Sequence, residues 1–153
     1  MKPRIYIDTS VIGGYYDKEF ETDTKLFFDG IRTRNYNVYL SEISNIELLP
    51  APQRVKDLVK EIPSDCLIFL NFTEEAEELA EKYLAEKILG KASMNDAYHI
   101  AIATVNRIDV LVSWNFKHIV NLDKIRLFNA VNMKYGYPSI DIRTPKELIK
   151  YED

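Results

Sequence analysis

The feature that most constrains the fold of this chain is the regular alternation of short apolar runs with longer amphipathic stretches. The apolar runs are rich in β-branched and aromatic residues, and they predict strands at 4–7, 37–40, 66–70, 109–113 and 139–142. Runs such as CLIFL and VLVS are apolar almost without interruption, which is typical of parallel strands that are covered on both faces. The chain therefore favours a sheet buried between two layers of helices.

The amphipathic stretches between these runs predict helices at 24–34, 44–49, 53–61, 73–89, 93–107 and 121–135. The stretch 73–89 has the clearest pattern, because it opens on a Thr followed by two Glu and is followed by Gly90. Gly13 and Gly14 are interpreted as a flexible turn. Strands that alternate with helices predict an α/β fold, a three-layer sandwich with a mostly parallel central sheet.

Composition narrows the functional classes. The net charge is −4 over 153 residues, so contact with nucleic acid is expected from a local basic rim and not from the whole surface. No apolar stretch is long enough to cross a membrane, and Cys66 is the only cysteine, which together favour a cytoplasmic protein. The phosphate-binding loop GxxxxGK[ST], the dinucleotide motif GxGxxG and the serine elbow GxSxG are absent.

Four polar residues are predicted at one edge of the sheet. Asp8 ends the first strand and Asn115 follows the fourth, while Glu47 and Asp96 are expected in the first turns of the helices that begin near 44 and 93. Carboxyl ends of parallel strands meet at one crevice. Three carboxylates in one crevice repel one another unless a cation lies between them, and oxygen ligands of this kind suit Mg²⁺ or Mn²⁺.

Each of these residues also has a purely structural interpretation. Ser44 with Glu47, and Ser93 with Asp96, fit the spacing of a helix capping box. The other two polar residues fit ordinary turns. For each acid taken alone the structural interpretation is favoured, whereas the occurrence of all of them along one edge favours a metal site.

Four segments together resemble the successive signature blocks of PIN domains: IYIDTSVI, SEISNIEL, NDAYHIAIAT and DVLVSWNFKHI. The resemblance covers about residues 4–120, and it implies a single PIN-like domain over 1–153 with a C-terminal extension. It implies a metal-dependent nuclease acting on RNA, similar to the VapC-like toxins that pair with a small antitoxin and commonly form homodimers. By this resemblance Asp8, Glu47 and Asp96 match the three main acidic positions.

The fourth block departs from the commonest PIN pattern, because Asn115 stands where many PIN domains carry an Asp. An Asn still supplies an oxygen but removes one negative charge, which should weaken a second metal site more than the first. The expected catalytic set is therefore Asp8, Glu47, Asp96 and Asn115, with the metal on Asp8 and Asp96 and on Glu47 directly or through water. Thr9, Ser10 and Ser113 are candidates for positioning water or phosphate, and Lys91, Lys117 and His118 for contacting RNA.

The leading functional hypothesis is a Mg²⁺- or Mn²⁺-dependent ribonuclease that acts as the toxin of a type II toxin–antitoxin pair. Two alternatives stay open: a catalytically weakened PIN-like module that binds nucleic acid or protein, and an RNA-processing nuclease unrelated to toxicity. His99 lies three residues after Asp96, and a packed or supporting histidine is favoured there over a metal ligand.

Overall fold

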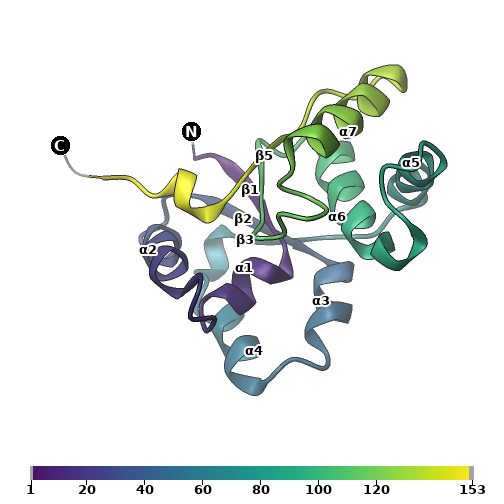
Figure 1. Cartoon of the computed structure of the whole chain (residues 1–153). Coiled ribbons are helices and arrows are strands. Elements are labelled where there is room, and N and C mark those ends of the chain that lie inside the picture. The colour runs from purple at the N-terminus through teal and green to yellow at the C-terminus, as the bar shows by residue number, and fades with distance from the viewer. Residues whose placement is uncertain (1, 152–153) are drawn as a thin grey trace.

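The computed structural model describes residues 2–151 and contains a central sheet of five parallel strands. The order across the sheet is β3-β2-β1-β4-β5. The strands are β1 (Arg4–Ile7), β2 (Asn37–Ser41), β3 (Leu67–Leu70), β4 (Val110–Val112) and β5 (Asp141–Arg143). The expected three-layer sandwich is confirmed, and all five strands are parallel (Figure 1).

Helices lie on both faces of the sheet (Figure 1), and one hydrophobic core fills the space on each face. One face packs against α1 (Thr9–Gly14), α2 (Glu21–Arg32) and α4 (Gln53–Lys60). The other packs against α5 (Glu74–Ala85), α6 (Met94–Val105) and α7 (Leu122–Lys134). The remaining elements are α3 (Glu42–Leu48) and three 3₁₀ turns, η1 (Ser64–Cys66), η2 (Lys91–Ser93) and η3 (Pro145–Leu148).

The alternation of side chains along β1 decides which residues meet near its end. Ile5 and Ile7 belong to the core beneath α1, α2 and α4, whereas Tyr6 belongs to the opposite core, which includes α6. This follows from the two-residue period of a strand. A tyrosine hydroxyl is thereby buried on the same side of the sheet as His99, which α6 carries.

Several predicted boundaries are wrong. Gly13 and Gly14 end the short helix α1 and do not form a flexible turn, because the chain coils directly after β1. Gly14 is required there, since an added Cβ would lie 2.8 Å from Cδ1 of Trp114. The helix predicted at 73–89 ends at Ala85, and the chain leaves it through Lys87 with a left-handed φ of 59°.

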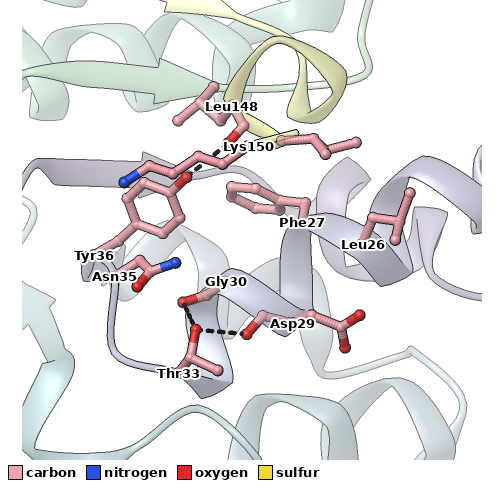
Figure 2. Close-up of a pocket in the computed structure, with 10 residues that line it drawn as sticks. Leu26, Phe27, Asp29, Gly30, Thr33, Asn35, Tyr36, Leu148 and Lys150 are labelled. Atoms are coloured by element: carbon pink, nitrogen blue, oxygen red, sulfur yellow. Dashed lines mark hydrogen bonds between the residues drawn. The ribbon is translucent and has the colours of Figure 1, made fainter. Parts of the chain in front are cut away.

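The chain beyond residue 118 completes the sheet and covers α2. β5 pairs with β4 at the sheet edge, and the hydroxyl of Tyr36 donates to the carbonyl of Leu148 at 2.7 Å. This segment forms a hollow of about 340 Å³ with α2, and Tyr36 and Lys150 are among the residues that line it (Figure 2). No residue of the predicted acidic site lines this hollow. Within residues 2–151 no helix combines the length and apolarity needed to cross a bilayer.

Candidate active site

The candidate site lies where the connections of the sheet reverse direction. From β1 the chain proceeds through β2 to β3 on one side, and β4 and β5 then extend the sheet on the other. Such a switch point leaves a crevice outside the carboxyl ends of the two central strands, here β1 and β4. Asp8 directly follows β1 and Ser113 directly follows β4, and the Asp8 backbone N–H donates to Val112 at 3.2 Å.

Two hydroxyl groups hold the buried carboxylate of Asp8, which is 4% exposed. Ser10 Oγ donates to Oδ1 at 2.5 Å, and Ser113 Oγ donates to Oδ2 at 2.6 Å. Each hydroxyl also accepts a backbone N–H, from Trp114 and Asn115 respectively, both at 2.9 Å. The two serines suggested for positioning water or phosphate therefore position Asp8 itself.

The electrostatic setting of Asp8 combines deep burial with opposing influences from its neighbours. Burial raises the pKa of Asp8 above its ordinary value and the charge of Asp96 raises it further, whereas the electrostatic influence of His99 and the hydroxyl hydrogen bonds lower it. Within residues 2–151 no Lys or Arg forms an ion pair with Asp8, Glu47 or Asp96. A buried carboxylate is costly without a counter-charge, so this oxygen-rich setting fits a divalent cation such as Mg²⁺ or Mn²⁺.

Glu47 lies in the last turn of α3, so its predicted place in a first turn is wrong. The helix begins at Glu42, immediately after β2, and its capping box is formed by Ser41 and Ser44. Ser44 is therefore the third helical residue and not the cap. The early start of α3 carries Glu47 one further turn along the helix, and its side chain is 25% exposed.

Glu47 is held through Oε1 by two residues from different elements. Thr9 Oγ1 donates to Oε1 at 3.2 Å, and His99 Nε2 forms a short hydrogen bond to the same oxygen. His99 is 1% exposed, and its Nδ1 lies 2.5 Å from the hydroxyl of Tyr6. Tyr6 also contacts Ser41 Oγ at 2.7 Å, and burial raises the pKa of its phenol. His99 is thus a packed histidine that contacts an acid, as expected.

Asp96 lies in the first turn of α6, as predicted, beside residues of the loop after β4. His118 Nδ1 lies 3.0 Å from Asp96 Oδ2, and Asn115 Nδ2 donates to the same oxygen at 3.3 Å. The amide oxygen of Asn115 accepts the backbone N–H of His118 at 2.9 Å. Asn115 therefore presents its nitrogen, and not its oxygen, to Asp96. Ser93 Oγ lies 3.2 Å from His118 Nδ1 and makes no helix-capping hydrogen bond.

A cleft of about 330 Å³ at this edge contains two of the three acids and not Asp8. It is lined by Glu47, Lys91, Ala92, Ser93, Met94, Asn95 and Asp96. Lys91 brings a positive charge to the rim of this cleft. Lys117 is exposed on the loop after β4 and does not line the cleft, whereas His118 is partly buried against Asp96.

The three acids do not form a ready-made metal site. Among residues 2–151, no three His, Cys, Asp or Glu side chains gather closely enough to hold an ion together. Asp8 and Asp96 influence each other electrostatically, while Glu47 is bound to His99. That all three acids share one ion stays a prediction.

Sequence reasoning missed Tyr6 and the role of Ser93 in this site. Tyr6 reads as one more apolar strand residue in Ile5-Tyr6-Ile7, and only its hydroxyl distinguishes it from its neighbours. The available signal was the pairing of a buried tyrosine at a strand end with a histidine on an apolar helix face, because buried polar groups need partners.

Comparison with solved structures shows similar folds at low identity. FitAcB from Neisseria gonorrhoeae aligns with a TM-score of 0.58 and 18% identity, covering 94% of this chain and 99% of the other. VapC20 from Mycobacterium tuberculosis, described as a sarcin–ricin loop cleaving toxin, aligns with a TM-score of 0.58 and 15% identity over 89% and 98%. VapBC2 from Rickettsia felis, bound to a DNA fragment from its promoter, gives 0.55 and 15% over 92% and 98%.

Comparison with curated proteins gave no match. The PIN domain model matches residues 5–118, which extend from the second residue of β1 past the end of β4 and contain all four polar residues predicted at the sheet edge. Because this match covers more than half of the chain, the protein belongs to the PIN domain family.

Proposed function

We propose that this protein is a Mg²⁺- or Mn²⁺-dependent ribonuclease that hydrolyses RNA phosphodiesters. The observation that carries the proposal is the buried Asp8 carboxylate at the switch point of a PIN fold. Among residues 2–151 it has no Lys or Arg partner, and burial and the charge of Asp96 raise its pKa. Membership of a family of nucleases supports the same reaction class.

The acids of this edge have distinct proposed roles. Asp8 and Asp96 hold the metal, and Glu47 binds it directly or through water. When bound, the ion lowers the pKa of a water molecule and neutralises charge on the phosphate. Ser10 and Ser113 keep both oxygens of Asp8 oriented. Asn115 acts by orienting Asp96 through its amide nitrogen.

The substrate side of the proposal rests on the cleft. Lys91 lines it and is placed to contact an RNA phosphate next to Glu47 and Asp96. Lys117 and His118 lie on the loop after β4 outside the lining of this cleft, and they remain further proposed contacts for RNA. Thr9 keeps its proposed role in positioning, because its hydroxyl donates to Glu47.

The proposed biological setting is a cytoplasmic toxin of a type II toxin–antitoxin pair. Two similar folds, VapC20 and VapBC2, are described as a toxin and as a complex bound to promoter DNA. We infer a small antitoxin protein as the partner of this chain, and a homodimer as its assembly. An RNA-maturation nuclease shares the same chemistry and differs in the absence of an antitoxin that inhibits it.

A second candidate is a PIN protein with weakened catalysis that binds nucleic acid or protein. Two observations favour it. The imidazoles of His99 and His118 already contact the carboxylates of Glu47 and Asp96 that a metal would need. Asn115 also donates to Asp96 through its amide nitrogen instead of offering an oxygen ligand.

The test is cleavage of single-stranded and structured RNA by purified protein. The ribonuclease proposal expects cleavage with Mn²⁺ that EDTA stops and that Asp8→Asn removes. Equal cleavage by the wild type and Asp8→Asn would reject it. RNA binding without cleavage, and without Mn²⁺ binding at millimolar concentration, would establish the second candidate instead.

A further inference from the structure

A continuous row of buried hydrogen bonds connects the start of α3 with the acid at its end. It runs from Ser41 Oγ to the hydroxyl of Tyr6, on to His99 Nδ1, and from His99 Nε2 to Glu47. Ser41 and Tyr6 are 0% exposed and His99 is 1% exposed. Only Glu47 reaches the cleft. The row therefore joins a dry interior to one acid of the site.

The chemistry of the groups fixes the direction of these bonds. A neutral imidazole has one donor and one acceptor nitrogen. His99 Nε2 lies against a carboxylate oxygen, which only accepts, so Nε2 carries the proton and Nδ1 accepts from Tyr6. The phenol of Tyr6 has only one proton, and it donates that proton to His99 Nδ1. In the hydrogen bond between Ser41 and Tyr6 the donor is therefore Ser41. For a neutral imidazole, the geometry thus implies the Nε2–H tautomer of His99.

The two carboxylate oxygens of Glu47 differ in their hydrogen-bond partners. The hydrogen bonds found for its carboxylate in residues 2–151 both end on Oε1, from Thr9 and His99. Oε2 keeps its lone pairs. We propose that Tyr6 and His99 are positioning residues for Glu47, which lock Oε1 and leave Oε2 for the metal or its bound water. This inference rests on the proposed function.

Four variants separate this role from simple packing. Tyr6→Phe removes the donor to His99 Nδ1 and keeps the ring. His99→Gln keeps an amide N–H that reaches the position of Nε2, whereas His99→Asn is too short to reach Glu47. Tyr83→Phe is the matched control, because Tyr83 is also fully buried and donates to Asn132 in the same core, away from the acids. Thermal unfolding of each variant reports whether it folds.

The first measurement is the ¹⁵N spectrum of the histidine rings, which reads the tautomer without any metal or RNA. We expect the Nε2–H tautomer of His99 in the wild type and in Tyr83→Phe, and a shifted Nδ1 resonance in Tyr6→Phe, where Nδ1 loses its donor. An Nδ1–H tautomer in the wild type, or an unchanged spectrum in Tyr6→Phe, would overturn the inference whatever the activity of the enzyme.

The second measurement is Mn²⁺ affinity by calorimetry, together with kcat and KM for RNA cleavage. We expect Mn²⁺ binding to weaken by about 10- to 100-fold in His99→Asn, by less in Tyr6→Phe, and to be largely retained in His99→Gln and Tyr83→Phe. The loss should appear in kcat and not in KM. Wild-type affinity and kcat in folded His99→Asn would overturn the positioning role while leaving the ribonuclease intact. No Mn²⁺ binding by the wild type would overturn the proposed function and, with it, this role of Glu47.

Discussion

Two acids of the site are each held by a histidine, but in opposite surroundings. In the inner pair, Glu47 contacts His99, whose side chain is 1% exposed. In the outer pair, Asp96 contacts His118, and these side chains are 20% and 25% exposed. The inner histidine is fixed from behind by Tyr6, whereas the outer one lies on a loop beside Ser93. The inner pair is therefore pre-organised, and the outer pair is free to open towards water.

This difference separates a fixed wall of the site from an adjustable one. A buried hydrogen-bonded partner cannot leave without stranding polar atoms, whereas a water-exposed pair exchanges its contacts at little cost. The outer pair is thus the place where Asp96 can release His118 to take up a cation. Asp8 belongs to neither pair, and its hydroxyl partners carry no charge.

The largest expected loss of cleavage activity comes from replacing Asp8. The replacement leaves both histidine–acid pairs intact, so the loss reports on Asp8 alone. Asp8→Asn should lower the rate of Mn²⁺-dependent RNA cleavage by about 10²- to 10³-fold, the size found when a group that stabilises the transition state is removed. Melting temperature should not fall, because a costly buried charge is removed. Asp29→Asn, an exposed aspartate beside the hollow of Figure 2, serves as the matched control and should cleave like the wild type.

The stability of two histidine variants tests whether the inner and outer pairs differ. His99→Ala should lower the free energy of unfolding by about 2–3 kcal/mol, because it removes the acceptor of the buried Tyr6 hydroxyl proton and leaves a cavity. His118→Ala should change it by about 0.5 kcal/mol or less, since its contacts are water-exposed. Urea unfolding measures both. Equal losses would show that the two pairs are not different in kind.

A smaller effect is expected in the pH dependence of stability without metal. The folded state raises the pKa of Asp8 above its ordinary value of 3.8, so in this window the folded state binds more protons than the unfolded state. The stability contributed by protonated Asp8 is present below pH 3.8 and is lost as the pH rises through the folded pKa. Asp8→Asn should flatten this part of the profile, measured by urea unfolding at several pH values. An unchanged profile would contradict the assigned burial effect.

The smallest effect is expected at the rim of the cleft. Lys91→Ala should weaken RNA binding by about fivefold or less and reduce the slope of log K against log salt by about 1, because one phosphate contact is lost. Lys150→Ala removes the same charge from the hollow beside α2 and should leave RNA binding unchanged. Fluorescence anisotropy over a range of salt concentrations measures RNA binding by both variants. Identical behaviour of the two variants would show that RNA does not bind in this cleft.

The layers of the fold could be predicted because period and burial are encoded locally. Val110, Leu111 and Val112 read as a covered parallel strand and form one beside β1. The short helix α1 was missed because two glycines normally mark a turn. Its cause is tertiary: Gly14 must stay small to admit Trp114.

The same division holds for the site. Asp8 and Asp96 could be placed from strand and helix boundaries alone, because topology carries these boundaries to one edge. The position of Glu47 in its helix was wrong, since a Ser-x-x-Glu spacing competed with Ser41, which caps α3 directly after the strand. The partnership of Tyr6 with His99 depends on a contact across 93 residues, which no local pattern contains.

The most direct test of the central claim is the position of Mn²⁺ in soaked crystals of the wild-type protein. The account predicts an anomalous peak coordinated by oxygens of Asp8 and Asp96, with Glu47 reaching it through Oε2 or a water. Asp8 and Asp96 keeping their serine, histidine and asparagine partners at saturating Mn²⁺, with no peak between them, would contradict it.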